Sequence, residues 1–162
     1  MALRRVHERG QVAAYAIVLF PLLVLVLSLV YVVGNVEDLR SRIRADLDMA
    51  SLTATQALDP AALASGAPPR LLPDEAVQLA RQYLAQNLGG LGSTLAESPS
   101  DAAAAAEVVV TNSGTDPITG SVVTAPTVSI RLAAPVHIEL LSVAGLPTTI
   151  SLTLVGSAAA RT

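Results

Sequence analysis

The sequence predicts an α+β protein: a long N-terminal transmembrane helix, followed by a small domain with one helix on an antiparallel sheet of 3–4 strands. Three observations lead to this prediction. An apolar run lies near the N-terminus, an apolar repeat at steps of three and four follows it, and period-two alternation appears near the C-terminus. A chain of 162 residues has room for one compact domain beside a membrane segment.

Residues 1–10 form a basic leader, and residues 12–34 form the predicted transmembrane segment. Arg4, Arg5 and Arg9 precede the apolar run, which is long enough to cross a bilayer core of about 30 Å. Because cationic flanks stay in the cytoplasm, we expect a single-pass protein of the cytoplasmic (inner) membrane, with its N-terminus inside and its C-terminal domain outside. A cleaved secretory signal is the main rival, but its apolar core would be shorter, at roughly 7–15 residues.

The helix is predicted to continue beyond the membrane, giving one long helix over residues 11–59. Pro21 lies inside it and is expected to kink it, because proline removes one backbone hydrogen bond. An apolar stripe typical of one helix face follows, made of Val36, Leu39, Ile43, Leu47, Ala50, Ala54 and Leu58. A helix of about 70 Å cannot be covered by so small a domain. We therefore expect Val36, Leu39, Ile43, Leu47 and Ala50 to pack against other subunits.

A second region, residues 74–162, is predicted to be a small extracytoplasmic domain. Asp59-Pro60 ends the long helix, and the Ala/Gly/Pro-rich residues 60–73 are predicted to be a linker. A helix is predicted from Pro73, with acidic residues in its first turn, to the Gly89-Gly90 pair. Residues 89–104 are predicted to be a loose stretch.

Four strands are predicted in the rest of the domain. Residues 107–111 are short and β-branched, and residues 112–117 are typical of a turn. Alternation of apolar and polar side chains then predicts half-buried antiparallel strands at 122–132, at 136–140 and at 150–154.

Candidate residues for chemistry are few. The net charge is −3, which gives no reason to expect nucleic acid as a partner, and the chain has no cysteine for a disulfide or a thiolate metal site. His137 and Glu139 share a strand face but lack a further ligand, and Asp116 is a single carboxylate in its loop. We therefore expect no catalytic residue, no cofactor, no metal site and no enzyme activity.

The N-terminal sixty residues resemble the TadE/TadG-like minor pilins, or pseudopilins, of the Tad branch of type IV pili. The resemblance rests on Arg9-Gly10, on residues 11–23 with Pro21, and on the Asp-Met-Ala-Ser-Leu-Thr-Ala-type stretch at residues 48–57; residues 150–161 resemble the family ending more loosely. It implies that a prepilin peptidase cuts between Gly10 and Gln11. It also implies that the partners are the membrane, other pilin-like subunits and the pilus assembly machinery, in an extracellular pilus after assembly.

One residue departs from the family pattern and leaves an alternative open. Such pilins carry Glu at the fifth mature position, where it neutralises a neighbouring N-terminal amine, and this chain has Tyr15. The alternative is a permanently signal-anchored envelope protein whose outer domain binds a partner. The state of Gly10 separates the two, because a filament subunit loses its leader and an anchor keeps it. A membrane-tethered enzyme, the third hypothesis, would need a constellation of residues that the sequence lacks.

Overall fold

The computed structural model describes residues 3–143 and 145–160. The chain divides into two compact units, Met1–Asp38 and Leu39–Thr162, and helix α1 (Leu3–Ala54) belongs to both. The predicted α+β class, with a long apolar N-terminal helix and a small antiparallel sheet, is confirmed. Residues 60–73, predicted to be a linker, lie inside the second unit, and so does the second half of α1.

Helix α1 ends at Ala54, before the predicted stop at residue 59. The backbone tightens there, because the Thr55 N–H donates to the carbonyls of Ser51 and Leu52, both at 3.2 Å. The Thr55 hydroxyl also donates to the Leu52 carbonyl, at 2.7 Å. Asp59 instead begins the next helix, α2 (Pro60–Ala64), where its side chain accepts from the Ala61 N–H at 2.9 Å. The Asp-Pro signal thus marks a helix start and not a helix end.

The chain on either side of α2 is closed on itself. Leu58 and Leu71 form an antiparallel bridge, and the Asp59 N–H donates to the Arg70 carbonyl at 2.9 Å. The Asn112 side chain then binds both backbone groups of Leu71, accepting from its N–H at 2.7 Å and donating to its carbonyl at 3.1 Å. Leu71 is fully buried. This segment is therefore a docked loop.

Three further helical segments follow. Helix α3 (Pro73–Leu88) has the predicted bounds, and its buried residues are Ala76, Ala80, Leu84 and Leu88. The stretch predicted to be loose contains a 3₁₀ helix, η1 (Gly89–Thr94), and a short helix, α4 (Pro99–Ala105). Ser98 caps α4 by accepting from the Asp101 N–H at 3.1 Å, with Pro99 at the first helical position. That prediction was wrong because an alanine-rich segment was judged by composition and its capping residues were not weighed.

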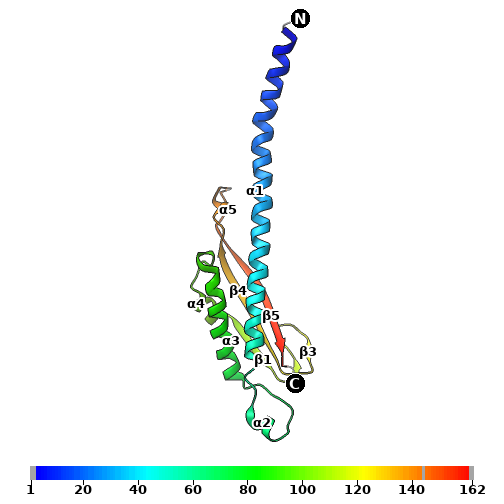
Figure 1. Ribbon diagram of the computed structural model, residues 1–162, viewed down its shortest axis with the longest axis vertical. Helices are drawn as coiled ribbons and strands as arrows, with labels where there is room; N and C mark the ends of the chain where they lie inside the picture. Colours follow the sequence, from blue (N-terminus) through cyan, green and yellow to red (C-terminus); the bar gives the residue numbers. More distant parts are fainter. Residues whose placement is uncertain (1–2, 144, 161–162) are drawn as a thin grey trace. The chain divides into compact units, whose positions relative to one another are not determined.

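The main sheet has three antiparallel strands in the order β1 (Glu107–Thr111), β4 (Thr127–His137) and β5 (Thr149–Ala159). A small second sheet pairs β2 (Gly114–Thr115) with β3 (Val122–Val123), and helix α5 (Leu140–Val143) caps the β4–β5 connection. Figure 1 shows these elements along the chain.

The strands predicted at 122–132 and 136–140 are not separate as expected. Residues 127–137 form one continuous strand, and Leu140 lies in α5. Pro135 is tolerated inside β4 because β1 pairs only as far as Arg131, so no ladder donor is needed on that side. The Pro135 carbonyl there accepts from the Ala96 N–H, at 2.9 Å.

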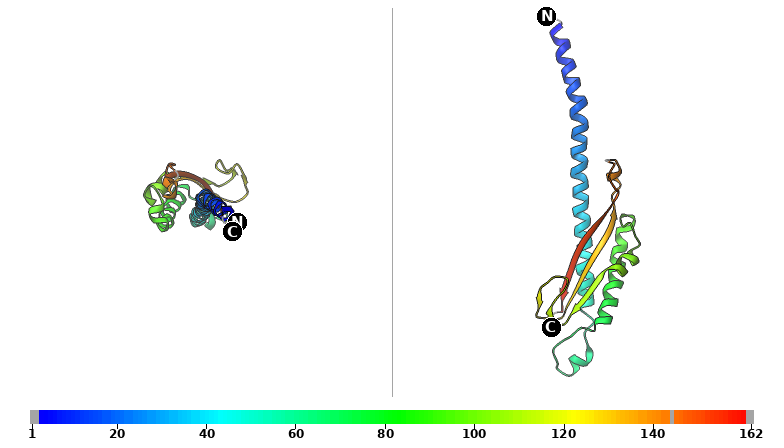
Figure 2. Two further views of the ribbon diagram at one scale, coloured as in Figure 1. Left: turned by 90° about the horizontal axis from the view of Figure 1, so that it is seen from above. Right: turned by 180° about the vertical axis from the view of Figure 1, so that it is seen from behind.

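The core lies on one face of the main sheet. Val128, Ile130, Leu132, Ala134 and Val136 of β4 are all buried on that face. The second half of α1 and helix α3 both lie on this side of the sheet (Figure 2). The β2–β3 loop packs against the opposite face, where Ser129 is also buried.

Candidate functional site

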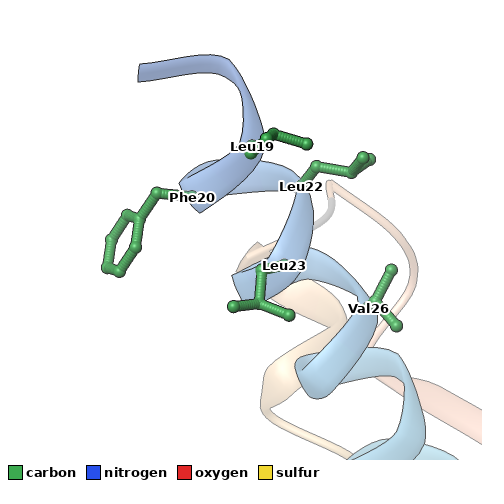
Figure 3. Close-up of a pocket in the computed structure, with 5 residues that line it drawn as sticks. All are labelled: Leu19, Phe20, Leu22, Leu23 and Val26. Atoms are coloured by element: carbon green, nitrogen blue, oxygen red, sulfur yellow. The ribbon is translucent and has the colours of Figure 1, made fainter. Parts of the chain in front are cut away.

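The first candidate surface is the apolar part of α1 in the first unit. Large apolar side chains are exposed all around this part of the helix, with Val32 half-buried among them, and the exposed series is Tyr15, Ile17, Val18, Leu19, Phe20, Leu22, Leu23, Val24, Leu25, Val26, Leu27, Leu29, Val30, Tyr31 and Val33. Figure 3 shows five of them projecting outward from successive turns. By length and composition, this is the one helix in the described residues that could cross a membrane. An apolar surface of this extent needs lipid or protein around it.

Two residues change the hydrogen bonding inside this apolar stretch: Ser28 adds a hydroxyl that bonds within the helix, and Pro21 lacks a backbone N–H. The Ser28 hydroxyl donates to the Val24 carbonyl at 2.8 Å, which lowers the cost of placing it in an apolar medium. Pro21 lies inside α1, and the helix continues through it. Proline lacks the N–H that would reach back one turn, so one carbonyl loses its helical partner there. The predicted kink at Pro21 stays a prediction.

The predicted processing residues, Gly10 and Gln11, lie within α1. The Gln11 side chain is outside the described part of the structure. Tyr15, at the fifth position after Gly10, is 65% exposed. Arg161, in the C-terminal stretch that resembles the family, also lies outside the described residues.

The stripe predicted to pack against other subunits has a different partner in the structure. Leu39, Ile43, Leu47 and Ala50 are buried within the second unit, whereas Val36 is half-buried. Their side chains form part of the chain's own core, so they are not available to a neighbour while this unit is folded. The helical periodicity was read correctly, but periodicity does not reveal whether the covering surface comes from the same chain.

Helix α1 approaches the sheet closely at Gly156 of β5. A Cβ placed on Gly156 would lie 2.7 Å from the Leu47 Cβ, 2.9 Å from the Leu47 carbonyl carbon and 3.0 Å from an Asp48 carboxylate oxygen. Only a residue without a side chain leaves room for the helix backbone here. Glycine inside a strand is the sequence signal for such an approach, and our reading of the sequence did not use it.

Asp116 is the centre of the most developed polar cluster. Its side chain is 1% exposed and accepts from the Ile118 N–H at 2.9 Å, the Thr119 hydroxyl at 2.6 Å and the Ser129 hydroxyl at 2.5 Å. Burial by itself would raise the pKa of Asp116, but these hydrogen bonds outweigh it and lower the pKa. The carboxylate holds the β2–β3 loop against β4, which gives it a structural role.

The remaining titratable residues form no metal-binding cluster in the part of the chain that the structure describes. Within residues 3–143 and 145–160, no three His, Cys, Asp or Glu side chains are close enough to hold a metal ion. His137 ends β4 half-buried, and Glu139 is exposed just beyond the strand. Arg131 donates to the Glu107 carboxylate at 2.9 Å, across two paired strands.

Comparison with known proteins gives no relative from which to argue: no family model, no curated protein and no solved structure matches the chain.

Proposed function

We propose that the protein is a minor pilin or pseudopilin of a Tad-like pilus or secretion system, with a structural role in assembly. The observation that carries this proposal is the extensive exposed apolar surface on the first part of α1, in a helix that continues into the core of a small α+β unit. The sequence resemblance of the N-terminal sixty residues agrees with it. In this proposal the N-terminus lies on the cytoplasmic side of the inner membrane, and the second unit lies outside.

Subunit contacts in this proposal use surfaces that the fold leaves uncovered. The apolar segment 12–34 partitions into the bilayer and packs against equivalent helices. Beyond it, Ala45, Met49 and Leu52 follow one another along the outer face of α1, with Met49 and Leu52 both more than half exposed. This short apolar strip replaces the buried stripe as the contact of the second unit, since residues at steps of three and four share a helix face.

A second candidate is favoured by Tyr15. With tyrosine at this position, the N-terminal amine of a processed neighbour would lack its usual Glu partner. An unpaired buried charge is costly, which disfavours incorporation into a filament. The chain would then remain a permanently signal-anchored envelope protein whose outer unit binds a partner. Neither candidate requires catalysis, a cofactor or a metal.

The deciding experiment is the mass of the N-terminus of the protein purified from its native host. We expect a chain that begins at Gln11. A Gly10→Leu variant is the matched control and should retain its leader, because the resemblance places the cut after this glycine. An intact leader in the wild-type protein would overturn the pilin proposal in favour of the permanent anchor.

The packing claim has its own test, which exploits the absence of native cysteine. Single cysteines at Met49 and at Leu63 replace two side chains of similar exposure, 56% and 50%. We expect oxidative cross-linking between subunits at Met49 and much less at Leu63, which lies on α2. Equal cross-linking at both positions would contradict the assignment of the contact to the outer face of α1.

A further inference from the structure

The β4–β5 connection carries an apolar tip that the proposed function does not use. Leu140 and Leu146 are 37% and 54% exposed, and Leu141 between them is half-buried. Glu139, at the base of this tip, is its one acidic residue, and the segment 138–148 contains no cation. The tip is thus a small protruding apolar surface with little charge.

The backbone of this tip is satisfied by its own hydrogen bonds. The Gly145 N–H donates to the Ser142 carbonyl and the Leu146 N–H to the Leu141 carbonyl, both at 3.0 Å, and Gly145 has φ +67°. This pattern is a Schellman motif, which typically brings the residue after the glycine onto the last helical turn. The Ile138 N–H donates to the Thr148 carbonyl at 2.7 Å and closes the base. Such a turn can enter an apolar medium without exposing many unpaired backbone groups.

The tip lies at the end of the second unit where α1 enters it. Strand β5 and the second half of α1 run in the same direction, with α5 at the Leu39 end, as both side views show (Figures 1 and 2). From Gly156, which abuts Leu47, back to Thr149 the strand covers about 23 Å at roughly 3.3 Å per residue. From Leu47 back to Leu39 the helix covers only about 12 Å. Strand β5 is therefore long enough to reach the Leu39 end of the unit before the tip begins.

We infer that this tip, formed by residues 138–148, contacts the lipid surface of the membrane that α1 enters. The inference rests on the membrane anchoring in the proposed function. Lipid is the expected partner because Leu39, at this end of the unit, follows the predicted membrane segment 12–34 by only five residues, and because the exposed side chains are leucines on a turn with satisfied backbone groups. Glu139 at the base is then placed at headgroup level. The tip and the anchor together give the unit two contacts with the membrane instead of one.

The test uses the full-length protein, reconstituted in phosphatidylcholine vesicles, with single cysteines that carry an environment-sensitive fluorophore. Leu146→Cys reports on the tip, and Leu25→Cys reports on insertion of α1. Val122→Cys is the matched control, since it replaces an apolar residue that is even more exposed, at 76%, in strand β3 at the opposite end of the unit. Each sample is quenched separately with a nitroxide-bearing lipid and with aqueous iodide, after its fold is checked by circular dichroism.

We expect lipid nitroxide to quench the labels at 146 and 25, and iodide to quench the label at 122 most strongly. A label at 146 that behaves like that at 122, while the label at 25 is quenched by lipid, would overturn this inference and leave the anchor intact. Protection of 146 from iodide without lipid quenching would assign the tip to a protein contact and would also overturn it. If the label at 25 is not reached by lipid nitroxide, the anchoring proposal fails first.

Discussion

Replacing Gly156 by alanine tests whether the close approach of α1 to β5 holds the second unit together. The new Cβ would meet the Leu47 carbonyl carbon at 2.9 Å, and this atom belongs to a helix backbone that cannot move alone. Overpacking of this kind costs about 1–3 kcal/mol. The reduced freedom of the unfolded chain returns about 0.5–1 kcal/mol. We therefore expect a net loss of about 1–2 kcal/mol in the free energy of unfolding.

The assay is thermal unfolding of the full-length protein in detergent, followed by circular dichroism. For a unit of this size, the loss corresponds to a fall in Tm of roughly 5 °C. Gly89→Ala is the matched control, because Gly89 has φ −56° and a Cβ there meets nothing within 4 Å. It should leave Tm unchanged or raise it by about 1–3 °C. Equal Tm values for the two variants would refute the close-packing argument.

Three further predictions concern the second unit. Asp116→Asn should cost about 2 kcal/mol, because it weakens hydrogen bonds to a buried carboxylate. Since folding lowers the pKa of Asp116, its stabilisation is complete above its unfolded pKa, about 3.9, and is lost as pH falls through the folded pKa. Chemical denaturation at several pH values should therefore show a smaller loss on acidification in Ser129→Ala, and an unchanged pH slope would contradict this. Leu47→Asp places a charge at a fully buried position, so it should lower the free energy of unfolding by more than about 3 kcal/mol. The second unit should then unfold while the apolar part of α1 still inserts into the membrane. A native-like melting curve would contradict this prediction. Glu107→Gln removes an exposed ion pair with Arg131. In a thermal melt it should change the free energy of unfolding by less than about 0.5 kcal/mol. A loss above about 1 kcal/mol would show that the ion pair contributes more than its exposure suggests.

Local signals in the sequence predicted local structure well. The bounds of α3 follow from Pro73 and from the Gly89-Gly90 pair, and β1 follows from a β-branched run before a turn. The apolar stripe after the membrane run was also identified from its spacing. These features depend on residues close in sequence, where capping, turn chemistry and periodicity act directly.

The features that sequence reasoning missed depend on partners distant in the chain. The stripe on α1 is covered by the chain's own sheet, and only the tertiary fold shows that its partner is internal. Residues 122–132 and 136–140 were predicted as separate strands, because the sequence does not show that β1 stops at the register of Arg131 and leaves room for Pro135 inside β4. Asp116 was noted only as a single carboxylate in its loop, and the structure shows that its oxygens are used by Ser129 and by that loop.

Predictions about chemistry were made from residue types alone, and the expectation of no catalytic residue, cofactor or metal stays a prediction. Interaction surfaces were harder to predict, because they consist of the side chains that remain exposed after the chain has packed against itself. The exposed strip at Met49 and Leu52 and the tip at Leu146 could be recognised only once the buried stripe had been assigned to the core.

The contact between Leu47 and Gly156 also sets the order in which the protein can be made. Leu47 leaves the ribosome among the first residues of the second unit, and Gly156 is among the last. While the chain is being made, the apolar stripe on α1 therefore lacks the cover that strand β5 gives it in the folded unit. The core of this unit is complete only after β5 has been made, since contacts between distant parts of a chain form late. In the proposed membrane topology, a holding chaperone where the chain leaves the membrane, or a ribosome that stalls before β5, would thus act on a chain whose anchor is placed but whose core is still open.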